Sequence, residues 1–328
     1  MDPIVINIMD LTQGITQTDL STPLLVATDK AYDLKLISSL EELDGLEKTD
    51  NLYKMAASLL SQRPQDVYVL GLASAASGSV VVDAINKADI PHYYLATDLR
   101  TAEKRAPVAK AYGAKIGFYV AAGGLEETAD VLVTEAKTLN TEGTMIMAHK
   151  GVRSEDVFAD CAMIGKMAPV LEGTAPFYYQ SLDGIPDGGY SKADVSKLQA
   201  GNVNTVTTYM KRIETWTGKT TKGSYCHFKV LKDWLQVRLK EALAKVIHND
   251  KGVFMSEEGL GAITAAMKEV LDVGKTGRGV IYDYTVYTPL RSEIPANDRA
   301  NGIVNGFQIQ VTFTGFVEKV VVNIVAEV

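Results

Sequence analysis

The stretch from Phe307 to Val328 reads FQIQVTFTGFVEKVVVNIVAEV and largely decides the fold of the C-terminal region. Apolar and polar residues alternate strictly over residues 307–314, which predicts a strand with one face on a core and the other in water. After Gly315 a second strand is predicted over residues 318–328. Its apolar side chains share one face: Val320, Val322, Ile324, Ala326 and Val328. Such an edge must be covered by its own domain or by another subunit.

The two closing strands are expected to have different roles. The first belongs to the core of the subunit, because its alternation is clean, whereas the second is expected to leave and pair elsewhere, with Gly315 near the point of departure. The beginning of the chain offers a similar strand, in which Ile4, Ile6 and Ile8 alternate with their neighbours. A polar connector over residues 11–23 follows it. Both ends therefore supply a tethered strand that is able to add to another sheet.

Composition narrows the possible functions of the 328-residue chain. The hydrophobic fraction of 46% and the charged fraction of 22% are typical of a globular protein. The net charge of -7 gives no basic face for nucleic acid. Cys161 and Cys226 fit no metal or redox spacing, and no apolar run is long enough for a membrane span. Because residues 1–3 lack the basic flank of a signal peptide, we expect a protein made inside the cell.

Residues 23–168 alternate between strands and helices. Strands are predicted at residues 24–28, 66–72, 92–97, 115–121 and 144–149. Helices are predicted at residues 40–46, 52–61, 80–87, 102–112 and 125–139, and from a cap at Ser154 to about residue 166. Repeated units of this kind favour a mainly parallel sheet with helices on its faces. This part is expected to be an open α/β layer.

The rest of the chain has a different pattern. Residues 169–222 are turn-rich, with a helix after Ser191 and strands at residues 203–208 and 211–216. Two amphipathic helices follow, at residues 229–248 and from the Ser256 cap to about residue 273, and then a strand at residues 280–288. The expected fold class is α+β, divided into an arm (1–22), the α/β domain (23–168), the turn-rich β segment (169–222) and a C-terminal helix-and-sheet domain (223–328).

An enzyme is the alternative interpretation. The loop from Gly71 to Ser79 lies between a strand and a helix, where phosphate-binding loops occur, yet it matches neither the dinucleotide fingerprint nor the P-loop. Asp98 and His149 fall at predicted strand ends, the ligand edge of an open sheet. These residues define a possible nucleotide- or metabolite-binding enzyme. The sequence singles out no catalytic, cofactor-binding or metal-binding set, because the four histidines include no pair at metal-ligand spacing.

The C-terminal half resembles the contractile-tail sheath proteins of bacteriophages, in particular the short sheath-like family. The resemblance is carried by KDWLQVRL at residues 232–239, by the helix at 256–273, by IPANDRA at 294–300 and by FTGFVEKV at 313–320. Weaker matches lie at residues 160–169 and 198–204. The resemblance covers roughly residues 155–328. The α/β part matches only in general character, and the P-G-V-Y-like opening of many larger sheaths is missing.

The resemblance implies a structural protein and not an enzyme. In such sheaths the two terminal arms each add a strand to neighbouring subunits, which builds stacked six-fold rings around a tail tube and lets the lattice contract without breaking. It implies as partners other copies of the chain, the tail tube protein, and baseplate and tail terminator proteins, in a virion tail assembled in the host cytoplasm. The exchanged positions would be Ile4, Ile6, Ile8, Val320, Val322, Ile324 and Val328.

The resemblance also implies a surface that faces the tube. It assigns the second amphipathic helix to this role, and polar residues on the helix or just after it become candidate contacts: Thr264, Lys268, Asp272, Lys275 and Arg278. The three basic residues would meet an acidic tube. Such contacts are expected to be individually weak and sensitive to salt, because contraction must release them. A solvated helix face is the alternative for each residue.

Overall fold

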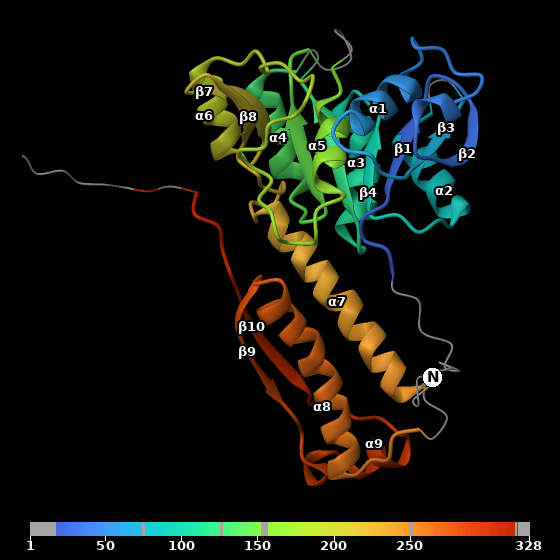
Figure 1. The fold of residues 1–328 in the computed structure, drawn as a ribbon, viewed down its shortest axis with the longest axis vertical. Helices are drawn as coiled ribbons and strands as arrows, with labels where there is room; N and C mark the ends of the chain where they lie inside the picture. Colours follow the sequence, from blue (N-terminus) through green and yellow to red (C-terminus); the bar gives the residue numbers. More distant parts are fainter. Residues whose placement is uncertain are drawn as a thin grey trace, which may run out of the picture.

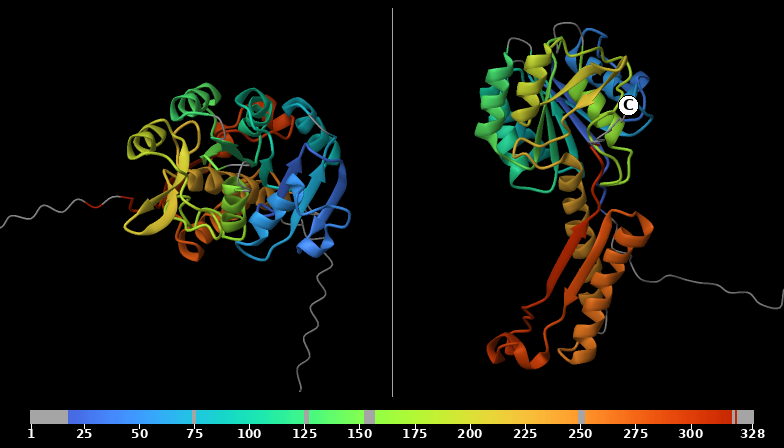
Figure 2. Two further views of the ribbon diagram at one scale, coloured as in Figure 1. Left: turned by 90° about the horizontal axis from the view of Figure 1, so that it is seen from above. Right: turned by 90° about the vertical axis from the view of Figure 1, so that its left-hand side faces the viewer.

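The computed structural model describes residues 18–73, 76–124, 127–151, 157–248, 252–318 and 320. Within these residues the chain forms two lobes, and the long helix α7 (Cys226–Ile247) extends from one into the other (Figure 1). We call the part before α7 the α/β lobe. The hairpin lobe consists of the second half of α7 and the elements that follow it, which pack along that helix (Figure 2).

An eight-stranded sheet forms the centre of the α/β lobe, in the order β2-β3-β1-β4-β5-β6-β7-β8. The strands are β1 (Pro23–Ala27), β2 (Tyr32–Ile37), β3 (Val67–Gly71), β4 (Tyr94–Thr97), β5 (Phe118–Gly123), β6 (Thr144–Ala148), β7 (Asn204–Tyr209) and β8 (Arg212–Trp216). The inner strands β3, β1, β4, β5, β6 and β7 run parallel to one another. The edge strands β2 and β8 are each antiparallel to their neighbour. The predicted parallel sheet is therefore confirmed. Strands β7 and β8, from the turn-rich segment, extend the same sheet.

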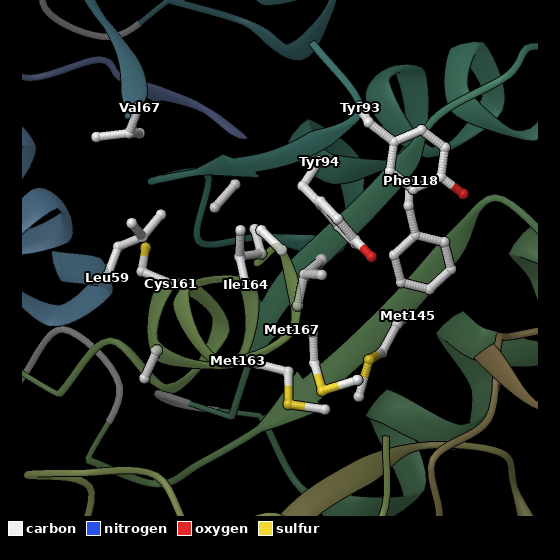
Figure 3. Packing of buried hydrophobic residues seen from close by; sticks show 14 of the residues in the cluster. Leu59, Val67, Tyr93, Tyr94, Phe118, Met145, Cys161, Met163, Ile164 and Met167 are labelled. Carbon is white, nitrogen blue, oxygen red and sulfur yellow. The ribbon is translucent and has the colours of Figure 1, made fainter. Parts of the chain in front are cut away.

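Helices cover both faces of this sheet, so the central strands are apolar throughout. Leu24 and Val26 point into the layer of α2 (Gly78–Ala88), α3 (Ala102–Gly113), α4 (Ala129–Leu139) and α6 (Lys192–Ala200). Leu25 points to the opposite layer, formed by α1 (Asn51–Leu60) and α5 (Ala159–Met167). Figure 3 shows this second layer, where α5 side chains pack beside Tyr94 and Phe118.

The hairpin lobe combines two helices with two strands. Helix α8 (Glu257–Asp272) packs along α7 and starts at Ser256, whose side chain accepts a hydrogen bond from the backbone of Gly259, as the sequence predicts. A π-helical turn (Val273–Gly277) leads into β9 (Ile281–Tyr287), which pairs antiparallel with β10 (Gln308–Phe313). Ile309, Val311 and Phe313 pack against the core, so the predicted core role of the first closing strand is confirmed. The short helix α9 (Ala296–Ala300) lies between the two strands in sequence.

Some local predictions are wrong. The expected helix at residues 40–46 is only a 3-10 turn (Leu40–Glu42), and Gly45 adopts a left-handed conformation with φ of 81°. Strand β2 is missing from the predicted elements, although its residues alternate between apolar and polar. Helix α4 begins after its cap Thr128, and α5 begins only at Ala159, so Ser154 is not its cap.

Candidate functional site

The β9–β10 hairpin is a sheet of only two strands in the described part of the chain. One face packs on the core through Tyr284, Val286 and the inward residues of β10. The other face is in solvent, and Tyr282 on β9 is 72% exposed. A two-stranded sheet gains stability from further strands, and no other strand of the described residues pairs with either outer edge. The hairpin is therefore a candidate site for added strands.

Residues 314–318, which we call the C-terminal strap, run from β10 back to the α/β lobe (Figure 1). The Thr314 amide donates to Val280 O over 2.9 Å. At the other end, the Tyr179 hydroxyl donates to Glu318 O over 3.2 Å, and the Tyr225 hydroxyl donates to the Glu318 carboxylate. The chain thus leaves the hairpin close to Gly315, and these contacts still hold it to its own subunit at Glu318.

Aromatic rings surround the strap at the start of α7. Phe316 contacts His227 edge-on at 4.9 Å between ring centroids, and Phe313 stacks on Phe228 at 6.0 Å. His227 is 2% exposed, and neither ring nitrogen has a hydrogen-bond partner in the described residues. Burial lowers the pKa of His227 to about 4, so the ring is neutral near pH 7. The hydrogen bond with Glu318 raises the pKa of Tyr225 to about 12.

A buried ionic network fixes the first half of α7 in the α/β lobe. Asp233 accepts from the Tyr93 hydroxyl at 2.8 Å and from Lys229 Nζ at 2.6 Å. All three side chains are largely buried. At the next position of the same helix, the Arg278 guanidinium lies over the Trp234 ring, 4.6 Å from the ring centroid. The KDWLQVRL motif therefore joins the two lobes through packing and charge.

The predicted tube-facing residues do not share one face. Thr264 is 8% exposed, and its hydroxyl bonds to Leu260 O and to the Thr288 hydroxyl, so it is not available on the surface of this subunit. Asp272 accepts from Tyr284, Lys275 pairs with Asp283 at 2.8 Å, and Arg278 pairs with Glu172 at 2.5 Å. Lys268 is exposed, and it has no ion pair among the described residues.

The strands predicted at the two termini lie mostly outside the described residues. This applies to the predicted positions Ile4, Ile6, Ile8, Val322, Ile324 and Val328. Val320 is described and is 73% exposed. At the other end, the Thr18 amide donates to the Glu241 carboxylate of α7 over 2.6 Å, and Leu20 is buried. The two terminal segments therefore enter the described structure at different places, Thr18 on α7 and Glu318 beside Tyr179.

The residues of the alternative enzyme interpretation do not come together. Asp98 and His149 follow β4 and β6, and β5 lies between these strands, which puts them about 10 Å apart across the sheet. Asp98 accepts from Thr28 and Asn51, whereas His149 bonds to Pro186 O and to the Gly151 amide. No group of three or more metal-ligating side chains occurs in the described residues.

The small-residue loop before α2 has a packing role. Ser77 caps α2 by accepting from the Val80 amide. A Cβ at Gly78 would lie 2.0 Å from Lys104 O, so the glycine is required for the close approach of α2 and α3. Ser74 and Ala75 of this loop lie outside the described residues. Among the helices that are described, none is long and apolar enough to cross a membrane.

Comparison with known proteins identifies the fold. A chain in the cryo-EM structure of the anti-feeding prophage baseplate, 6-fold symmetrised, matches with a TM-score of 0.71 and 14% identity over 99% of both chains. A chain of the same baseplate in its contracted state matches with a TM-score of 0.68 and 12% identity, over 99% of this chain and 98% of that one. The sheath tail protein of Desulfitobacterium hafniense matches with a TM-score of 0.63 and 9% identity, over 87% of this chain and 93% of that one.

No protein-family model and no curated protein matches the sequence. The structural matches nevertheless extend over nearly the whole chain, α/β lobe and hairpin lobe alike. The chain therefore has the fold of contractile-tail sheath-like proteins, as the C-terminal motifs predict. Sequence reasoning missed Tyr179, Tyr225 and His227. Their only signal was local clusters of aromatic residues, FYY at residues 177–179 and YCHF at residues 225–228.

Proposed function

We propose that this chain is a sheath-like structural subunit of a contractile tail or of a related injection machine. Copies of the chain assemble into stacked six-fold rings around a tube, and strands exchanged between subunits keep the rings connected during contraction. The observation that carries this proposal is the β9–β10 hairpin, a two-stranded sheet with open edges, in a chain of sheath-like fold. The subunit acts by assembly and force transmission and performs no chemical reaction.

In this proposal the hairpin accepts strands from neighbouring subunits. Residues 320–328 extend beyond the strap, and residues 4–9 precede Thr18 through a linker, so both ends are tethered. Burying four side chains of one arm (Val320, Val322, Ile324 and Val328) stabilises the contact by roughly 6–12 kcal/mol as an upper bound. Association costs about 4–15 kcal/mol. One exchanged strand is thus marginal, whereas several per subunit hold through multivalency.

The tube contact is assigned to the exposed face of α8. Lys268 is its candidate residue, since Thr264 is buried and Asp272, Lys275 and Arg278 bond within the subunit. The lysine would meet an acidic patch on the tube protein. A single exposed ion pair contributes about 1 kcal/mol or less, so a ring of copies is needed for a firm grip. The same weakness lets the contact break on contraction.

Electron microscopy of the purified chain tests the assembly. The proposal predicts rings or tubes, and it predicts that Val322→Pro abolishes them without unfolding the subunit, because proline removes a backbone donor from the added strand. Val322→Thr is the matched control, since threonine keeps the branched strand-forming side chain. A Val322→Pro chain that still polymerises would overturn strand exchange. If neither variant folds, the strand is internal to the subunit.

A second experiment tests the tube contact. Lys268→Glu should weaken co-sedimentation of assembled rings with the tube protein, with the largest effect at low salt. Lys192→Glu makes the same charge change on α6 of the other lobe and should leave co-sedimentation unchanged. Equal effects of the two variants would remove α8 from the tube-facing role.

A further inference from the structure

A groove of about 680 Å³ runs between α7 and α8 in the hairpin lobe. Ala242 and Val246 of α7 face Ala262, Ala266 and Val270 of α8 across it, and charged side chains line its rim. The small alanine side chains keep the two helices from filling the space between them. A groove with apolar walls and a polar rim is suited to an extended peptide segment.

The described chain begins at the rim of this groove. Glu241 lines the groove, and its carboxylate accepts the hydrogen bond of 2.6 Å from the Thr18 amide. The residues that precede Thr18 therefore start beside the groove. Its α7 wall, from Trp234 to Val246, spans about 18 Å at 1.5 Å per residue. Residues 11–17 cover up to about 23 Å when extended, so the segment is long enough to line the groove.

The chemistry of this segment matches the walls. Residues 11–17 read LTQGITQ, and in an extended chain Leu11, Gln13 and Ile15 point to one side. Two of these side chains are apolar and the middle one carries an amide oxygen. Trp234 lines one end of the same groove, so a docked segment lies near this tryptophan.

We propose that residues 11–17 lie in the α7–α8 groove of their own subunit. Leu11 and Ile15 pack against the alanine-lined walls of the groove. The linker is then a docked segment with a fixed exit point for the strand at residues 4–9. This proposal goes beyond the assembly function, which requires only that the arm reach a neighbour.

Fluorescence quenching in the full-length chain tests the docking. Trp216→Phe leaves Trp234 as the only tryptophan, because the sequence has two. A nitroxide on Thr16→Cys then reports proximity, since Cys161 and Cys226 are buried and do not compete for the label. The label should reduce Trp234 emission, and chemical reduction of the nitroxide should restore it. An emission that the label leaves unchanged would overturn the proposal.

A matched pair of alanine variants on α8 sharpens this test. Ala262→Phe fills the groove and should abolish quenching, whereas Ala265→Phe, at an exposed position outside the groove, should preserve it. Equal quenching in both variants would contradict the assigned groove. Mixing labelled chains that carry Trp234→Phe with unlabelled chains addresses the source of the segment. Quenching in that mixture would mean that the segment docks in a neighbouring subunit, against the proposal.

Discussion

Tyr93 donates a hydrogen bond of 2.8 Å to Asp233, across 140 positions of sequence, and so connects the residue before β4 with the second residue of the KDWLQVRL motif. Lys229 completes the arrangement by contacting both carboxylate oxygens. The direction of α7 is therefore set inside the α/β lobe, before the helix emerges toward the hairpin lobe. A substitution at Asp233 should therefore change the orientation of the two lobes relative to each other, and not only the local packing.

Asp233→Ala should lower the free energy of unfolding by about 3–5 kcal/mol, because it leaves Lys229 charged and buried without a counter-ion. Tyr93→Phe should cost about 1.5–3 kcal/mol through loss of one charge-assisted hydrogen bond. The double variant should cost less than the sum, since the two changes share one contact. Urea denaturation measures all three. Lys232→Ala is the control, an exposed lysine whose loss should cost less than about 1 kcal/mol.

Tyr225→Phe should loosen the C-terminal strap while leaving global stability nearly unchanged. Loss of the bond to Glu318 removes about 1 kcal/mol, which corresponds to a roughly fivefold larger open fraction. Limited trypsin digestion reads this out as faster cleavage after Lys319. Tyr287→Phe removes a comparable exposed bond to Glu293 on the hairpin and should not change that cleavage. An equal increase in both variants would mean that Glu318 does not anchor the strap.

His227→Phe should stabilise the protein and flatten its response to acid. The folded-state pKa of His227 lies near 4, below its ordinary value of 6.5, so the unfolded chain binds a proton first as pH falls. The free energy of unfolding therefore falls by up to about 1.4 kcal/mol per pH unit between pH 6.5 and 4, and the loss is absent above pH 6.5. Denaturation from pH 4.5 to 7.5 should show a smaller slope in His227→Phe.

Arg105→Met should destabilise the α/β lobe by about 3–5 kcal/mol. The Arg105 side chain is fully buried, bonds to Glu135 and Glu127, and also donates to Ala122 O at 2.9 Å. Its removal leaves the Glu135 carboxylate buried without the arginine as its counter-ion. The double variant Arg105→Met, Glu135→Met should recover part of the loss. Thermal unfolding of the single and double variants distinguishes a buried charge penalty from simple loss of packing.

Gly78→Ala and Gly261→Ala should have effects of opposite sign. At Gly78 the new Cβ would lie 2.0 Å from Lys104 O, so α2 and α3 must separate, at a cost of about 1–3 kcal/mol. At Gly261, inside α8, nothing lies within 4 Å, and alanine should stabilise the helix by about 0.5–1 kcal/mol. Melting temperatures measure both. A neutral Gly78→Ala would contradict the packing role assigned to that glycine.

Strong periodicity made most of the fold predictable. The continuous apolar strands of the parallel sheet and the Ser256-capped helix are local signals, and the structure has them where they are expected. Strand β2 was missed although residues 32–36 alternate between apolar and polar side chains, because the segment is a short edge strand of which little is buried. The helix predicted at residues 40–46 was too long, because only Leu40–Glu42 form a 3-10 turn and the left-handed Gly45 ends the segment.

The candidate site was less predictable because it depends on contacts between distant segments. The departure of the last strand cannot be placed from Gly315 alone, since Glu318 is held by Tyr179 and Tyr225 from elsewhere in the sequence. The polar character of Thr264 suggested exposure, yet its hydroxyl bonds within the subunit. Only tertiary packing decides such cases.

The strap and the segment after Thr18 have a mechanical consequence for α7. Both pass between the lobes beside this helix, one bound at Tyr225 and the other at Glu241 (Figure 1). A helix of 22 residues, about 33 Å long, bends and twists when it is the sole connection between two bodies. Here three segments connect the lobes at separate points, namely α7, the C-terminal strap and the segment after Thr18, and together they resist bending. Torque applied to the α/β lobe therefore reaches the hairpin lobe with little loss to flexing.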